Sequence, residues 1–134
     1  MILGVDHVGI AVVDLEGSVD TYRRTLGLEP SHRERVEDQG VEEVLFAAGA
    51  TSIQLLGALG PDTPVGTFLA KRGPGVHHIA YRVDDVAATL SHLRDEGVRL
   101  VDETPRRGSR DTLIAFVHPK DMGGVLVELV QVPA

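Results

Sequence analysis

The chain contains the same pattern twice. Residues 6–27 read DHVGIAVVDLEGSVDTYRRTLG, and residues 77–98 read HHIAYRVDDVAATLSHLRDEGV. Each stretch places a His on an alternating apolar segment, passes an Asp, and enters a segment with helical apolar spacing that reaches a Gly. A chain that repeats strand and helix in this order is expected to fold as two similar modules.

Each half continues with further strand patterns. Alternating apolar residues predict strands near residues 4–12, 30–37, 41–48 and 52–58, and again near 76–83, 98–102, 112–117 and 125–131. Helices are expected after Asp14, up to Gly27, and after Asp84 or Asp85, up to Gly97. Each module therefore reads βαβββ, and because a lone module would leave sheet edges open, the two modules should pair.

The two modules are expected to form one domain over residues 1–134. Module 1 covers about residues 1–60 and module 2 about residues 75–134. The linker, about residues 61–74, is rich in Pro and Gly and is expected to hold a short helix over 64–72. The polar segment 103–111 is expected to be a mobile loop.

Composition excludes several classes of protein. The chain has no Cys, so disulfide frameworks and thiolate zinc sites are excluded. Its net charge of −7 argues against nucleic-acid binding, which needs a basic surface. No apolar run is long enough to span a membrane, and the N-terminus lacks the basic start of a signal peptide. We expect a cytoplasmic protein.

Four side chains fall at equivalent places in the two halves. His7 and His78 stand 71 positions apart, and Gln54 and Glu128 stand 74 apart, each on a predicted strand. A lone His is usually a hydrogen-bonded packing residue, but two at equivalent places are hard to explain by packing alone. Two imidazoles and two oxygen donors suit a divalent transition metal. The repeat thus predicts one metal site in a central cleft between the modules.

Surface positions are also possible for some of these polar residues. Glu128 lies in the apolar run VLVELV and could face outward, although Leu126 and Val130 would then share the solvent side. An amide such as Gln54 is common on surfaces. Glu42 and Glu43 are adjacent on a strand, so one faces the cleft and could be a general base, but composition does not choose between them.

Several motifs resemble the vicinal oxygen chelate superfamily and, within it, the family of methylmalonyl-CoA epimerases. They are DHVGIAV at 6–12, DQGVEEV at 38–44, SIQLL at 52–56, GVHHIAYRVDD at 75–85 and FVHPKDMGGVLVEL at 116–129. The resemblance covers nearly the whole chain. It implies an α+β fold in which two paired βαβββ modules form a curved mixed sheet around a central metal cleft.

The resemblance also implies a chemistry. His7, Gln54, His78 and Glu128 match the family's metal ligands, and Glu43 matches the carboxylate that transfers the α-proton. The implied reaction interconverts (2R)- and (2S)-methylmalonyl-CoA through a metal-stabilised enolate, with Glu128 as a candidate for the second proton-transfer group. Co²⁺ is the favoured ion, and Zn²⁺, Mn²⁺ or Ni²⁺ could replace it. An acyl-CoA substrate and a homodimer are expected.

The same superfamily contains proteins with different functions. A glyoxalase I-like isomerase or a thiol-transferring resistance enzyme would also use a metal, whereas a non-enzymatic drug-binding protein would not need the four ligand types. An extradiol dioxygenase needs two His and one carboxylate with open positions, one of which Gln54 would fill. If the substrate carries CoA, then Lys71, Arg72 and Lys120 on predicted turns are candidates for binding its phosphates.

Overall fold

The computed structural model describes residues 1–133 and divides into two compact units. Unit 2 comprises residues 7–77, and unit 1 comprises residues 1–6 and 78–134. The first six residues belong to unit 1 because they bond to it directly. The N–H of Asp84 donates to the carbonyl of Met1 at 3.3 Å, and Arg82 pairs with Asp6 at 2.7 Å.

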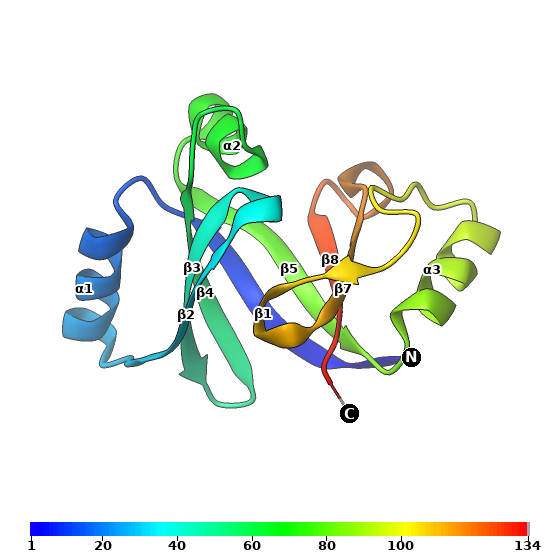
Figure 1. The fold of residues 1–134 in the computed structure, drawn as a ribbon, viewed down its shortest axis with the longest axis horizontal. Coiled ribbons are helices and arrows are strands. Elements are labelled where there is room, and N and C mark those ends of the chain that lie inside the picture. Colours follow the sequence, from blue (N-terminus) through cyan, green and yellow to red (C-terminus); the bar gives the residue numbers. More distant parts are fainter. Residues whose placement is uncertain (134) are drawn as a thin grey trace. The chain divides into compact units, whose positions relative to one another are not determined.

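The elements follow the predicted order, with short 3₁₀ helices added between strands (Figure 1). In chain order they are β1 (Ile2–Ala11), α1 (Leu15–Leu26), β2 (Pro30–Val36), η1 (Glu37–Gln39), β3 (Val41–Ala48), β4 (Thr51–Ala58), α2 (Pro64–Arg72), β5 (Gly75–Val83), α3 (Val86–Asp95), β6 (Arg106–Arg107), η2 (Ser109–Asp111), β7 (Leu113–Val117), η3 (Pro119–Asp121) and β8 (Leu126–Gln131). The predicted α+β class and the βαβββ order of each half are confirmed.

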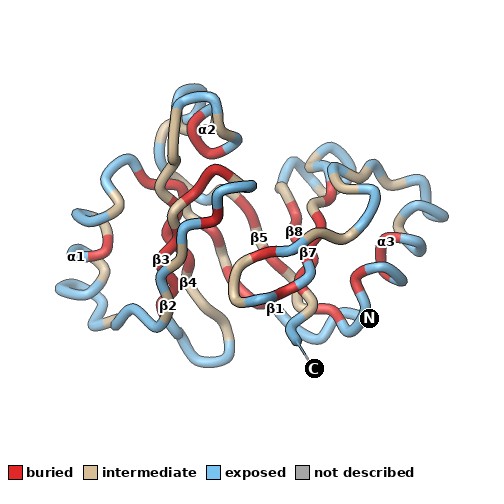
Figure 2. The backbone as a smooth tube through the Cα atoms, in the orientation of Figure 1, coloured by how far each residue is buried: buried red, intermediate tan, exposed pale blue. Residues whose placement is uncertain are grey.

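The strands of unit 2 are ordered β2-β3-β4-β1. The β1–β4 pair is parallel, and the β2–β3 and β3–β4 pairs are antiparallel. Helices α1 and α2 both contact β4. The core under α1 is built from apolar side chains of α1, β3 and β4, among them Val19, Phe46 and Leu55, together with Val12, which directly follows β1. Figure 2 shows that buried positions follow the strands.

Unit 1 repeats this arrangement with the order β5-β8-β7-β6. Its β5–β8 pair is parallel, while β7–β8 and β6–β7 are antiparallel. Helix α3 packs on β7 and β8. Its buried face, Val86 and Leu90, contacts Val117 and Leu129. Both halves therefore carry a sheet with one parallel pair and a helix on one face.

Both ends of α1 are found where the sequence placed them, whereas α3 ends at Asp95, two residues before the expected Gly97. Asp14 caps α1 by accepting a hydrogen bond from the N–H of Gly17 at 3.1 Å, and Gly27 follows the helix with a left-handed φ of 69°. Of the two candidate caps for α3, Asp85 is the one used, since it accepts from the N–H of Ala88 at 3.0 Å. The predicted helix over 64–72 is confirmed as α2.

Two expectations for the second half are wrong. The strand expected near 98–102 is reduced to one isolated bridge, between Leu100 and Val117. The reason is that the N–H of Arg99 donates to the Asp121 carboxylate at 2.9 Å instead of to a strand. The segment 103–111, expected to be loop throughout, contains β6 and η2.

Among the described residues, no helix has both the length and the apolar character needed to span a membrane.

The choice between the two caps of α3 can be tested by substitution. Asp85→Ala should lower the free energy of unfolding by about 1 kcal/mol, because it removes the N-cap acceptor. Asp84→Ala is the matched control: Asp84 is exposed, and its carboxylate pairs with the terminal ammonium of Met1 at 3.3 Å, a kind of surface pair worth about 0–1 kcal/mol. Urea unfolding of both variants measures this. A larger loss for Asp84→Ala would contradict the assignment.

Candidate active site

The predicted site residues are among the buried polar side chains of the structure. His7, His78 and Glu128 are 3%, 3% and 5% exposed, Gln54 is 7% exposed and Glu43 is 1% exposed. Buried polar groups need partners, and a buried carboxylate needs a hydrogen bond, an ion or a proton. The outward-facing alternatives for Glu128 and Gln54 are therefore wrong, and the partners of these five side chains define the site.

In unit 2, strand register places His7 and Gln54 on one face. Gly9, two residues after His7, is paired with Gln54 across the parallel β1–β4 pair. Residues two apart on a strand point to the same side, so His7, Gly9 and Gln54 share a face. Leu45 on β3 is also paired with Gln54, and Glu43, two residues earlier, therefore lies on that face too.

A buried hydrogen bond joins Gln54 to Glu43. Gln54 Nε2 donates to Glu43 Oε2 at 2.5 Å. The other oxygen of each group, Gln54 Oε1 and Glu43 Oε1, is buried and has no hydrogen-bond partner among the described residues. A buried acceptor without a donor costs about 1–3 kcal/mol. The two oxygens are therefore candidate contacts for an ion or a substrate.

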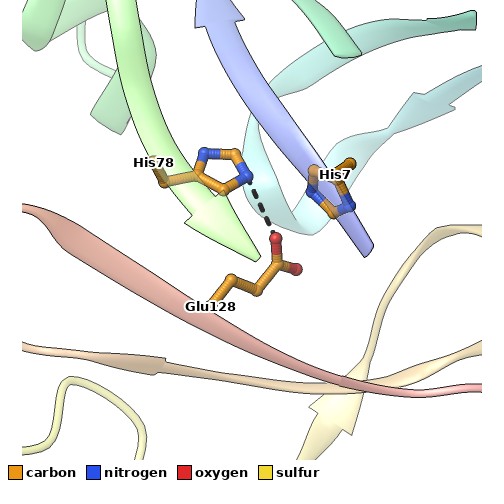
Figure 3. A group of neighbouring side chains, drawn as sticks. All are labelled: His7, His78 and Glu128. Atoms are coloured by element: carbon orange, nitrogen blue, oxygen red, sulfur yellow. Dashed lines mark ion pairs between the residues drawn. The ribbon is translucent and has the colours of Figure 1, made fainter. Parts of the chain in front are cut away.

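In unit 1, His78 and Glu128 contact each other directly. His78 Nε2 lies 3.0 Å from Glu128 Oε1, and Figure 3, which also draws His7, marks this ion pair with a dashed line. Ala80, two residues after His78, is paired with Glu128 across the parallel β5–β8 pair. The rings of Phe116 and His78 are nearly perpendicular, at 84°, with their centroids 5.7 Å apart.

The two units therefore repeat the same register. In each, the residue two positions after the His is paired with the oxygen-bearing residue, Gln54 or Glu128, on the adjoining parallel strand. The repeat breaks at Glu43. Glu43 on β3 is paired with Leu56, which lies two residues after Gln54. The equivalent of Leu56 in unit 1 is Val130, two residues after Glu128, and its partner on β7 is Ile114. Only unit 2 carries a carboxylate at this place.

Glu42, the neighbour of Glu43, has a different environment. It accepts a hydrogen bond from Arg33 Nε at 2.9 Å and is partly exposed. Arg33 also donates to Glu16 of α1. The hydrogen bond to Glu16, followed by that to Glu42, raises the pKa of the Arg33 guanidinium above its ordinary value. Arg33 thus stays charged and holds Glu42 on the face away from Gln54.

Sequence reasoning missed a buried carboxylate beside His7. Asp6 is 2% exposed and pairs with Arg82 through one oxygen and with Arg110 through the other, each at 2.7 Å. Arg110 and the next residue have left-handed φ values of 55° and 59°, which are unusual for non-glycine residues. The arginines neutralise Asp6 and anchor the segment that leads into β7. The available signal was a charged residue in an apolar strand, directly before a candidate ligand.

The candidate phosphate-binding residues lie near the ends of two helices. Lys71 and Arg72 lie in the last turn of α2 and are exposed, and Lys120 lies in η3. The Arg72 guanidinium stands over the ring of Phe68, 5.7 Å from its centroid. The first two residues are on unit 2 and the third is on unit 1.

Comparison with known proteins identifies the family of the chain. A family model described as the Glyoxalase/Bleomycin resistance protein/Dioxygenase superfamily matches residues 6–116. The ethylmalonyl-CoA/methylmalonyl-CoA epimerase of Cereibacter sphaeroides is 40% identical over 134 residues, which cover 98% of this chain and 100% of the relative.

Solved structures extend the similarity to the fold. The crystal structure of methylmalonyl-CoA epimerase from Mycobacterium tuberculosis is 47% identical, with a TM-score of 0.95 over 99% of this chain and 90% of that one. A methylmalonyl-CoA epimerase in complex with methylmalonyl-CoA and NH4+ is 46% identical, with a TM-score of 0.97 over 100% and 97% of the two chains. The chain therefore belongs to the glyoxalase/bleomycin resistance protein/dioxygenase superfamily.

Proposed function

We propose that the protein is an enzyme that interconverts (2R)- and (2S)-methylmalonyl-CoA by removing and returning the proton at C2. The observation that carries the proposal is the buried Glu43 carboxylate, bonded to Gln54 and left with one unpartnered oxygen among the described residues. The epimerases that resemble the chain over nearly its whole length support this choice over a glyoxalase I-like isomerase or a drug-binding protein.

We infer that His7, Gln54, His78 and Glu128 hold one divalent metal ion. The donor set fits such an ion, because imidazole nitrogens with amide and carboxylate oxygens suit first-row divalent metals. Gln54 Oε1 supports the assignment, since it is a buried acceptor that lacks a donor among the described residues. When bound, the ion would supply Lewis-acid stabilisation of the negative charge that develops on the thioester oxygen. Co²⁺ is our proposed ion, with Zn²⁺, Mn²⁺ and Ni²⁺ as substitutes.

Glu43 is the proposed base for one face of the substrate. Its hydrogen bond to Gln54 orients the carboxylate, and its second oxygen, which lacks a partner within residues 1–133, is available to accept the C2 proton. Epimerisation requires a second group that returns a proton to the opposite face. The position in unit 1 that corresponds to Glu43 is occupied by Ile114, which cannot transfer a proton. Glu128 is therefore the candidate that we retain for the second face.

The remaining proposals concern the partners of the enzyme. The substrate class is an acyl-CoA, and Lys71, Arg72 and Lys120 are cations that could bind its phosphates despite the acidic net charge. We also propose a homodimer, which the resemblance to the methylmalonyl-CoA epimerase family implies. The two units would act as one cytoplasmic domain.

The proposed metal site can be tested by measuring how much divalent metal the purified protein holds. Purified wild-type protein should hold one divalent ion per chain, and His78→Ala should lose most of it because the substitution removes one of the four donors. His92→Ala is the matched control, since His92 is an exposed His of α3. Elemental analysis after dialysis measures the content. Equal metal retention in wild type and His78→Ala would exclude the site.

The proposed base can be tested against its neighbour. Glu43→Gln should keep the fold and the metal, because the amide is nearly isosteric and can still accept from Gln54. Turnover in epimerisation should fall by about 10²-fold or more. Glu42→Gln should keep turnover within a few-fold, because Glu42 bonds to Arg33 on the other face. A chiral assay of methylmalonyl-CoA gives both rates, and full activity in Glu43→Gln would refute the role.

A further inference from the structure

A second cluster of metal-ligating side chains lies at the edge of the sheet in unit 2. His32 and Glu34 are two residues apart on β2, and Glu34 is paired directly with Glu43 of β3. Strand alternation therefore puts all three side chains on one face. One ring nitrogen of His32 and one carboxylate oxygen from each Glu lie within 4.8 Å of one another. His32 Nε2 is 2.8 Å from Glu34 Oε1.

The charges around this cluster favour a cation. Two carboxylates that face each other across an antiparallel pair repel. The arginines of β2 are engaged elsewhere: Arg33 bonds to Glu16 and Glu42, and Arg35 bonds to Glu37 at 2.5 Å. Glu43 Oε1 is buried and has no hydrogen-bond partner within residues 1–133. The buried oxygen is thus an acceptor that a positively charged ligand would satisfy.

The fold itself does not require this cluster. In unit 1 the pair that corresponds to Glu34 and Glu43 is Arg106 and Ile114, across the β6–β7 pair. Arg106 lies over the ring of Phe116, 5.6 Å from its centroid, and pairs with Asp102 at 3.3 Å. An equivalent place in the duplicated sheet can therefore be filled without acidic residues, which makes the acidic cluster a specific property of unit 2.

We propose that His32, Glu34 and Glu43 form a second divalent-cation site, whose occupation removes Glu43 from proton transfer. One imidazole and two carboxylates, completed by water, make a donor set suited to Zn²⁺. His32 and Glu34 are partly exposed, so the ion can enter from solvent. The bound ion occupies the Glu43 carboxylate that would otherwise accept the C2 proton. The inhibitory part of this inference rests on the proposed function, and the binding part does not.

Binding is tested first, with Zn²⁺ as the probe. Protein already loaded with its resident metal is dialysed against buffered ZnCl2, and total metal per chain is measured. Wild type and the control His92→Gln should reach two ions per chain. His32→Gln and Glu34→Gln should each bind the second ion at least about tenfold more weakly, because a metal-site residue is lost. Two variants are used so that poor folding of one does not decide the result.

Activity is tested in the same samples, each compared with its own zinc-free rate. The turnover of wild type and of His92→Gln should fall about 10²-fold when the second ion binds, because the loss of a positioned base has an effect of this size. His32→Gln should keep its zinc-free rate at the same zinc concentration. Equal inhibition of wild type and His32→Gln, or a second ion bound without inhibition, would overturn the proposal.

Failure of the proposed cation site and failure of the proposed function give different results. If the protein binds a second ion that depends on His32 but never epimerises methylmalonyl-CoA, the proposed function is refuted and the cation site stands. If the protein epimerises its substrate but binds only one metal ion at saturating zinc, the cation site is refuted and the proposed function stands.

Discussion

The hydrogen bond from Gln54 Nε2 to Glu43 Oε2 is the interaction on which the rest of the site depends. An amide has one donating and one accepting end, so donation to Glu43 fixes the position of the Gln54 oxygen. The bond leaves one oxygen on each side chain without a hydrogen-bond partner among the described residues. A single contact thus orients both a proposed metal ligand and the proposed base. The same Glu43 carboxylate also belongs to the proposed second cation site.

Duplication accounts for the order of the candidate site, and a departure from the repeat at one position makes the site asymmetric. Each unit contributes one parallel strand pair with the same register. In each pair, the residue two positions after the His is the partner of the oxygen-bearing residue, Gln54 or Glu128. This repeated register supplies the proposed metal ligands in equivalent pairs. Proton transfer to two faces needs groups that differ in their environments. The structure departs from the repeat at the corresponding positions Glu43 and Ile114, where only one carries a carboxylate.

Much of the fold and of the candidate site could be predicted from the sequence, because the repeat allows each half of the chain to be compared with the other. His78, at the equivalent place in the second half, indicates that His7 is a site residue and not only a packing residue. The predicted elements of the first half are found with small shifts in their ends. The choice between Glu42 and Glu43 could not be made, because it depends on the bond of Glu42 to Arg33 on a neighbouring strand. The expected strand at 98–102 failed for a similar reason, since Asp121, distant in sequence, accepts from the N–H of Arg99.

The most direct test of the proposed chemistry is exchange of the C2 proton. The protein is incubated with methylmalonyl-CoA in D2O, and deuterium at C2 is followed by mass spectrometry before and after removal of metal with a chelator. We predict that metal-loaded protein incorporates deuterium at C2, that the chelated protein does not, and that added Co²⁺ restores exchange. Metal-loaded protein that never incorporates deuterium, or exchange that continues at full rate after the metal is shown to be gone, would contradict this chemistry.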